Sequence, residues 1–329
     1  MKEWRVMSSE LRVDGALLFD VSMRTQIEVT GRDRVKFLHS FCTNDIKKLQ
    51  PGQGCEAFVT NVNGKVLGHI FVFAERDSLW LESVHSAAME LLPHFEKYVI
   101  TEDVNFTDRS AEFFECLLVG EPSTALLERL GLSVTTLARN EHLAHGSVLL
   151  PARSVRRVDW FGSPTWLISI PIDQEDKAIQ TLTYAGAKVL SVGDFSETFH
   201  SLRIAAGFPL YGRDITEDNL AQEAGRTSQA ISFTKGCYLG QEPIARIDAM
   251  GHVNRQLCRL ELSSETFLAD DTYVFDKPPP DAKVIGTITS AARDRLLGAD
   301  RFLAMAYLRS SFAKPGSQVF VDGHGASVL

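Results

Sequence analysis

The sequence is best interpreted outward from one stretch, Phe233-Thr234-Lys235-Gly236-Cys237-Tyr238-Leu239-Gly240-Gln241-Glu242. Its two glycines allow tight turns and close backbone approach, and its cysteine lies two residues from Lys235. A nearby cation lowers the pKa of a thiol and makes it a better nucleophile or metal ligand. The stretch therefore marks Cys237 as a candidate reactive group. The alternative is the commoner role of cysteine, a small buried apolar side chain.

A second polar segment lies upstream, Arg203-x-x-x-Gly207-x-Pro209-x-Tyr211-Gly212-x-Asp214. Residues 195–206 have apolar positions at helical spacing and are followed by a glycine, so Arg203 is expected on a helix that leads into a rigid turn. Arginine can bind a carboxylate with two hydrogen bonds, which makes Arg203 a candidate binding residue. The alternative is a surface helix and loop with no ligand.

Strand and helix patterns alternate through the first 252 residues. Two β-rich runs, 55–60 and 65–74, flank Val62-Asn63-Gly64, and Asn-Gly favours a hairpin because both residues tolerate positive φ. Residues 173–185 have the pattern of a helix that Gly186 ends. After residue 252 the pattern changes to short strands separated by Gly, Pro and Asp turns. The sequence predicts an α+β protein with a C-terminal antiparallel β-barrel, its strands near 257–262, 273–275, 284–290, 305–308 and 319–321.

Composition excludes several classes of function. The 329 residues carry a formal charge of −8, which argues against direct nucleic-acid binding because that binding relies on Lys and Arg at phosphates. The five cysteines include no C-x-x-C pair, so neither a disulfide framework nor a metal site is expected. Residues 1–10 lack the apolar core of a secretory signal, and no apolar run is long enough to cross a membrane. We therefore expect a cytoplasmic protein without membrane contact.

Taken together, these motifs resemble the YgfZ family, a branch of the superfamily that contains the glycine-cleavage T-protein (aminomethyltransferase). The Lys-Gly-Cys-Tyr-x-Gly-Gln-Glu string is the most specific part of the resemblance, which spans nearly the whole chain. The segments that carry it are Phe19–Ser22, Val29–Gly31, Phe37-Leu38, Thr43–Asp45, Leu202-Arg203, Gly207–Gly212, Gln222–Gly225, Lys235–Glu242, Gly286–Ser290 and Ala304–Tyr307.

The resemblance implies a cloverleaf of two α+β modules within residues 1–252, arranged around a central hole that binds tetrahydrofolate or a one-carbon derivative. Residues 253–329 would form the third module, the barrel. It implies that Arg203 lines the folate cavity and that residues 235–242 form a loop close to it. The folate-contact residues we expect are Arg24, Phe199, Arg203, Tyr211, Gln241, Glu242 and Arg246. For Phe199 the alternative is a structural role in the hydrophobic core.

The sequence departs from the aminomethyltransferase at two sites. That enzyme has an aspartate near the reactive folate nitrogen, whereas the matching stretch here, Gly64–Ile70, contains no acid and offers only His69 as a substitute. The commoner role of such a strand histidine is structural. A folate-contacting glutamate is also missing from the stretch Gly162–Leu167. Conversely, the T-protein lacks a cysteine at the position of Cys237. Glycine cleavage is therefore not the expected activity.

The YgfZ resemblance implies an accessory protein that assembles or repairs iron–sulfur clusters in client enzymes, including radical enzymes that modify tRNA. Clusters usually take about four thiolates, so Cys237 alone would act transiently, with Lys235 lowering its pKa. The expected partners are a reduced folate and iron–sulfur clients. The first alternative is a folate-dependent one-carbon enzyme, similar to an aminomethyltransferase or a demethylase, with His69 as its proton-transfer group. The second is a degenerate member that binds neither folate nor clusters.

Overall fold

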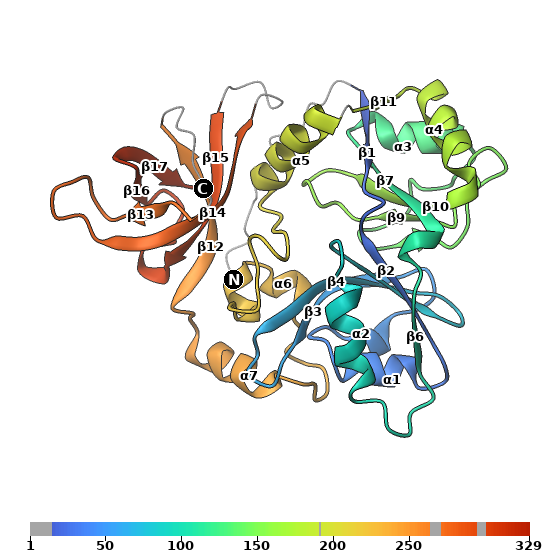
Figure 1. The fold of residues 1–329 in the computed structure, drawn as a ribbon, viewed down its shortest axis with the longest axis horizontal. Helices are drawn as coiled ribbons and strands as arrows, with labels where there is room; N and C mark the ends of the chain where they lie inside the picture. The colour runs from blue at the N-terminus through green and yellow to red at the C-terminus, as the bar shows by residue number, and fades with distance from the viewer. Residues whose placement is uncertain (1–14, 191, 264–270, 295–300) are drawn as a thin grey trace.

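The computed structural model describes residues 15–190, 192–263, 271–294 and 301–329. Residues 1–10, on which part of the targeting expectation rests, lie outside these ranges. Figure 1 shows two stacked sheets on one side of the molecule and a barrel on the other, with helix α5 between them. Within the described ranges, no helix is both long enough and apolar enough to cross a membrane.

The first sheet has five strands in the order β3-β4-β5-β2-β6. The predicted hairpin is confirmed, because β3 and β4 pair antiparallel and Gly64 between them has a φ of +72°. One face is covered by two helices, and their buried side chains, such as Leu91, pack against strand side chains such as Ile27 and Ile70. The elements are β2 (Thr25–Thr30), α1 (Arg34–His39), β3 (Gly54–Thr60), β4 (Val66–Ala74), β5 (Leu79–Ser83), α2 (Ala88–Glu96) and β6 (Asn105–Asp108), with a 3-10 turn at Ile46–Lys48.

The second sheet has six strands in the order β11-β1-β7-β10-β9-β8. Helices α3 and α4 cover its outer face, and α4 confirms the helix predicted over residues 173–185. The elements are β1 (Ala16–Asp20), β7 (Phe113–Val119), α3 (Pro122–Arg129), β8 (His142–Leu143), β9 (Ser154–Arg157), β10 (Thr165–Pro171), α4 (Glu175–Tyr184) and β11 (Ala187–Val189), with 3-10 turns at Ser110–Glu112 and Ile172–Gln174.

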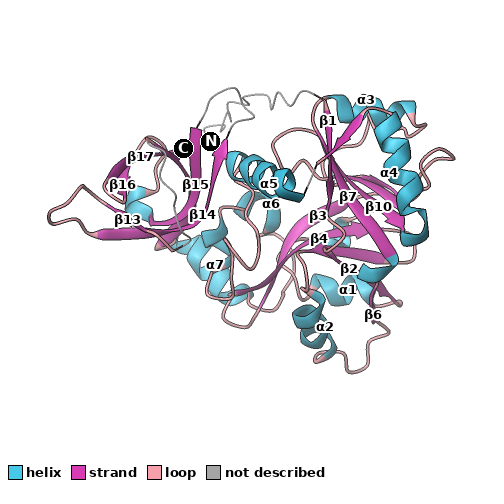
Figure 2. Ribbon diagram, turned by 45° about the horizontal axis from the view of Figure 1, so that its top comes forward, coloured by secondary structure: helices cyan, strands magenta, loops and turns pink. Residues whose placement is uncertain are grey.

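The inner faces of the two sheets pack against each other, so the sheets form the middle layers of a stack with helices outside (Figure 2). Aromatic side chains fill much of this interface, including Phe19, Phe71, Trp80 and Trp160. Burial of large aromatic side chains contributes strongly to stability, and it fixes the relative position of the sheets. Charged side chains that face this interface therefore sit in a largely apolar environment.

Helix α5 (Val192–Ala206) connects the sheets to the barrel and packs against two barrel strands, β14 (Val284–Asp294) and β15 (Arg301–Arg309). Three short helical elements follow it: η4 (Ala221–Ala224), α6 (Thr227–Ala230) and α7 (Gln241–Met250). We expected Gln241 and Glu242 to lie in a loop, but they form the first turn of α7. The difference arises because Gly240, at a φ of +82°, ends the loop in a left-handed conformation from which the helix begins.

The C-terminal strands close into a barrel of order β12-β15-β14-β13-β16-β17 with antiparallel pairing throughout. The predicted α+β class with a C-terminal antiparallel barrel is thereby confirmed. The barrel boundary at residue 253 stays a prediction. The strands are β12 (Arg255–Leu262), β13 (Tyr273–Phe275), β14 (Val284–Asp294), β15 (Arg301–Arg309), β16 (Gln318–Val321) and β17 (His324–Val328), with a 3-10 turn at Ser310–Phe312.

Candidate functional site

A cavity of about 520 Å³ opens where the two sheets meet the turn after α5. Its walls come from the β1–β2 connection, the β5–α2 connection and residues 210–213. The volume lies within the range of pockets that bind small organic molecules. Two of the expected folate-contact residues, Arg24 and Tyr211, line it together although they are far apart in the sequence.

Arg24 is held at this cavity by contacts on its inner side. Its guanidinium carbon lies 4.5 Å from the centre of the Trp160 ring, and its Nε lies 3.8 Å from a carboxylate oxygen of Glu115. Burial lowers the pKa of the guanidinium, and the Glu115 carboxylate opposes this effect. Because arginine has a very high intrinsic pKa, Arg24 stays positively charged, and its guanidinium lies over the face of the Trp160 ring.

Behind Arg24 lies a fully buried group of charged side chains contributed by both sheets. Arg156 on β9 donates through Nη1 to Glu82 on β5 and, at 3.5 Å, to Glu115 on β7. Burial raises the pKa of Glu115 well above its usual range, and the neighbouring Glu82 raises it further. The cations of Arg156 and Arg24 oppose this rise.

Tyr211 also lines the cavity. Burial raises the pKa of its hydroxyl, and the nearby Glu90 on α2, which also lines the cavity, raises it further. The phenol is therefore neutral at physiological pH and can donate or accept a hydrogen bond. The cavity wall thus combines a cation and a neutral hydroxyl, a pair that suits a ligand carrying an acidic group.

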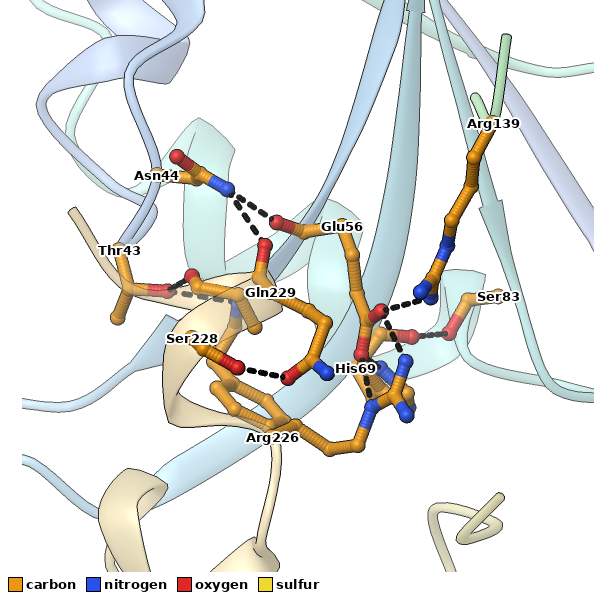
Figure 3. A network of polar contacts seen from close by, with 11 residues as sticks. Thr43, Asn44, Glu56, His69, Ser83, Arg139, Arg226, Ser228 and Gln229 are labelled. Carbon is orange, nitrogen blue, oxygen red and sulfur yellow. Dashed lines mark hydrogen bonds and ion pairs between the residues drawn. The ribbon is translucent and has the colours of Figure 1, made fainter. Parts of the chain in front are cut away.

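A second site surrounds Glu56, a carboxylate that the sequence analysis did not identify (Figure 3). The stretch around His69 contains no acid, but the neighbouring strand β3 supplies one. His69 Nε2 lies 2.8 Å from Glu56 Oε1, and both side chains are buried. One sequence signal could have identified Glu56: it is a glutamate inside the apolar run of a predicted strand. Charged side chains are rarely buried in such a strand unless they have a partner.

Two arginines hold the Glu56 carboxylate. Arg226 forms a two-point contact, with Nε to Oε1 at 2.7 Å and Nη2 to Oε2 at 2.5 Å, and Arg139 Nη2 reaches Oε2 at 3.2 Å. Burial by itself would raise the pKa of Glu56, but Arg226 and then His69 outweigh burial and hold it well below its usual range. Glu56 is therefore ionised and orients the imidazole of His69.

A row of aromatic rings joins this network to the cavity. The ring of His69 lies 5.9 Å from that of Phe208, which stacks on Trp160 at 5.1 Å. Trp160 in turn carries the guanidinium of Arg24. The Glu56 network and the cavity are thus two ends of one continuous packed region.

The expected thiol site lies elsewhere, at the edge of the first sheet. Lys235 is buried, and its Nζ donates to the carbonyl oxygens of His39 and Cys42, each at 2.5 Å. Burial lowers the pKa of Lys235. Cys237 is exposed, while the other four cysteines are buried or half-buried. That Lys235 lowers the pKa of Cys237 stays a prediction.

Arg203 is completely buried, and its Nη1 donates to Asp214 Oδ2 at 2.6 Å. The hydroxyls of Thr289 and Ser290 also donate to Asp214, which ties α5 to the barrel. Phe199 packs edge-on against two other phenylalanine rings. Five of the expected folate-contact residues do not belong to the cavity wall described above: Phe199, Arg203, Gln241, Glu242 and Arg246. Contact of these residues with folate stays a prediction.

Across the described ranges, no group of three or more His, Cys, Asp or Glu side chains is placed to hold a metal ion.

Comparisons with known proteins agree with this architecture. An aminomethyltransferase of Herpetosiphon aurantiacus is 27% identical over 314 residues, which is 94% of this chain and 82% of the relative. A chloroplastic protein of Arabidopsis thaliana, named only as a candidate transferase, is 25% identical over 317 residues, 94% of this chain and 68% of its own length. The crystal structure of the glycine cleavage system aminomethyltransferase T from Bartonella henselae has a TM-score of 0.82 at 21% identity, over 95% of this chain and 85% of that one.

The similarity to the Bartonella structure shows a shared fold. The family is shown by the sequence, because residues 8–235 match the GCVT N-terminal domain, well over half of the chain. The chain therefore belongs to the GCVT N-terminal domain family, in the superfamily of the glycine-cleavage T-protein.

Proposed function

We propose that the chain binds a reduced folate in the cavity lined by Arg24 and Tyr211 and acts as an accessory protein for iron–sulfur clusters through Cys237. The observation that carries the folate assignment is the composition of this cavity. A folate has a tail with two carboxylates and a pterin ring rich in hydrogen-bonding groups; Arg24 offers a cation to the former and the neutral Tyr211 hydroxyl a hydrogen-bond partner to the latter. The volume of about 520 Å³ suits a ligand of that size.

The accessory role rests on two features that differ from the aminomethyltransferase pattern. The stretch where that pattern has an acid contains none here and offers His69 as a substitute, whose imidazole contacts Glu56. The Lys235–Glu242 stretch, which resembles the YgfZ family, presents an accessible thiol. Soft sulfur ligands favour iron–sulfur chemistry, so an exposed cysteine suits transient contact with a client. The clients and the expected cytoplasmic location belong to this proposal.

Calorimetric titration of tetrahydrofolate into the reduced, anaerobic protein tests the folate site. Arg24→Ala should weaken binding by about tenfold or more, because a charge-assisted hydrogen bond contributes about 1.5–3 kcal/mol. Arg32→Ala is the control, since that side chain is exposed and pairs with Asp103. Absence of heat would overturn the folate assignment. Binding that is unchanged by Arg24→Ala would move the folate site away from this cavity.

The iron–sulfur role is tested in cells that lack the gene, by measuring the activity of several iron–sulfur enzymes. The wild-type chain should restore that activity, and Cys237→Ser should not. Cys258→Ser is the control because that cysteine is buried in the barrel. Equal restoration by wild type and Cys237→Ser would overturn the role of the thiol.

The Glu56–His69 pair also favours a second candidate, a folate-dependent one-carbon enzyme. A carboxylate that orients an imidazole is a common arrangement for proton transfer. The test is product formation from tetrahydrofolate and an aminomethyl or N-methyl donor. Turnover that is lost in His69→Gln, with folate binding retained, would establish the enzyme. Binding without turnover would favour the accessory role.

A further inference from the structure

Glu115 on β7 holds the β1–β2 connection, which carries Arg24, through both its backbone and its side chain. Its carbonyl accepts from the N–H of Val21 at 2.8 Å and from the hydroxyl of Ser22 at 3.3 Å, and its own N–H donates to that hydroxyl at 3.0 Å. Its side chain is completely buried and places a carboxylate oxygen 3.8 Å from Nε of Arg24. Glu115 therefore fixes the connection together with the side chain that the connection presents to the cavity.

The contact between Glu115 and Arg24 orients the arginine without using its hydrogen bonds. At 3.8 Å the two groups form an ion pair, and Nε of Arg24 has no hydrogen-bond partner in the part of the chain that the structure describes. The ring of Trp160 fixes the guanidinium from a second direction. A binding side chain that is held by its neighbours and not saturated by them is preorganised for a ligand.

Charged groups from three elements face the side chain of Glu115. Arg24 approaches it from the β1–β2 connection, Glu82 from β5 and Arg156 from β9. Arg156 donates through the same nitrogen, Nη1, to both carboxylates, so two acidic groups share one donor. Cys116, the next residue along β7, instead packs in the core beneath α3 and α4. Arg24 also lines the cavity, so it connects this buried group to a bound ligand.

Two carboxyl groups this close compete for one proton. Burial raises the pKa of Glu115, the charge of Glu82 raises it further, and a hydrogen bond between the two carboxyl groups acts in the same direction. The cations of Arg156 and Arg24 oppose these effects. Because the charge of Arg24 helps to keep the pair ionised, an anion that binds Arg24 weakens this help, and the pair then holds a proton more tightly.

We propose that Glu115 is the positioning residue of Arg24, and that the Glu82–Glu115 pair takes up a proton from solvent when Arg24 binds the carboxylate of an acidic ligand. The proton forms an O–H bond with a carboxylate oxygen of the pair, and no other covalent bond forms or breaks. The physical reason is that the ligand and Glu115 would otherwise place two negative charges on one guanidinium. This inference rests on the part of the proposed function that places an acidic ligand at Arg24.

Titration calorimetry of the full-length chain counts this proton. Tetrahydrofolate is titrated under anaerobic, reducing conditions in PIPES and in imidazole, whose ionisation enthalpies differ, so the difference in heat gives the number of protons taken from the buffer. We expect net uptake of up to one proton per ligand. An uptake of one proton corresponds to about a tenfold fall in affinity per unit of pH, so the affinity should fall about three- to tenfold from about pH 6.5 to about pH 7.5.

Glu115→Gln keeps the shape of the side chain but cannot titrate. It should abolish the proton uptake and make the affinity independent of pH, whereas loss of a merely structural group would weaken binding equally at every pH. Glu112→Gln is the matched control, because Glu112 pairs with Arg109 at the surface. His85→Gln should retain the uptake, and it is needed because a histidine can titrate near neutral pH. The charged or titratable side chains of the cavity wall besides Arg24 are Asp20, His85, Glu90, Tyr211 and Arg213.

The same titration with 4-aminobenzoylglutamate, which has the two carboxylates of folate without the pterin, separates this inference from the folate assignment. Tetrahydrofolate that binds without proton uptake, or an uptake that persists in Glu115→Gln, would overturn only the inference. Proton-linked binding of 4-aminobenzoylglutamate without binding of tetrahydrofolate would overturn only the folate assignment, and binding of neither would overturn both. If Glu115→Gln does not fold, infrared difference spectra of the wild-type chain decide, because the added proton must appear as a carboxylic-acid C=O band and its absence would overturn the inference.

Discussion

Replacing Glu56 with alanine should destabilise the fold more than any exposed charge change. The carboxylate accepts hydrogen bonds from Nε and Nη2 of Arg226, from His69 and from Arg139. Its loss leaves Arg226, with only 11% of its side chain exposed, without an anion in a buried position. Removing one member of a buried ion pair costs about 3–5 kcal/mol, or two to four orders of magnitude in the folding equilibrium.

Urea unfolding measures this loss of stability, and the fluorescence of the buried Trp80, Trp160 and Trp166 reports the transition. The matched control is Glu112→Ala, because Glu112 pairs with Arg109 at the surface and such pairs contribute about 0–1 kcal/mol. Adding Arg226→Met to Glu56→Leu should recover part of the stability, since the uncompensated charge is then gone. A cost below about 1 kcal/mol for Glu56→Ala, equal to that of the control, would refute the assigned role of this carboxylate.

Three further outcomes are expected. Gly240→Ala should lower both the free energy of unfolding and the yield of folded chain, because the added Cβ would lie 2.3 Å from the carbonyl oxygen of Asn61. The control is Gly251→Ala, which has a similar φ but open space around its Cβ and should cost about 1 kcal/mol in the same urea assay. The pKa of Glu56 is lower in the folded chain than its ordinary 4.5, so its stabilising contribution should be complete above about pH 4.5 and decline as the pH falls; acid unfolding of Glu56→Gln should lack that decline. Leu260→Ala, in the barrel core, should cost about 2–5 kcal/mol by urea unfolding, and a cost below 1 kcal/mol would contradict its burial.

The local parts of the fold could be predicted because their signals are local. The Asn-Gly turn specifies the β3–β4 hairpin through a glycine at positive φ, and short strands with frequent turn residues indicate the barrel. Helix α7 was missed for a local reason as well. It buries only Ile244, so it lacks the apolar periodicity by which amphipathic helices are identified.

The sites were less predictable, because each joins residues that are distant in the sequence. Glu56 and Arg226 are separated by 170 positions, and neither has a neighbour in the sequence that indicates the other. Arg24 and Glu115 meet only because β7 packs beside the β1–β2 connection. The cavity likewise forms where the β1–β2 connection approaches the turn after α5.

The sequence by itself determined the α+β class, the C-terminal barrel and the chemical character of the Lys235–Glu242 stretch, because turn residues, hydrophobic periodicity and residue type act over a few positions. The tertiary structure decided which buried charges pair: Glu56 with Arg226 and His69, Arg203 with Asp214, and Glu82 and Glu115 with Arg156. Burying a charge is costly unless an opposite charge or hydrogen-bond partner lies within contact distance. Whether one does depends on how distant segments pack, and local sequence does not encode that packing.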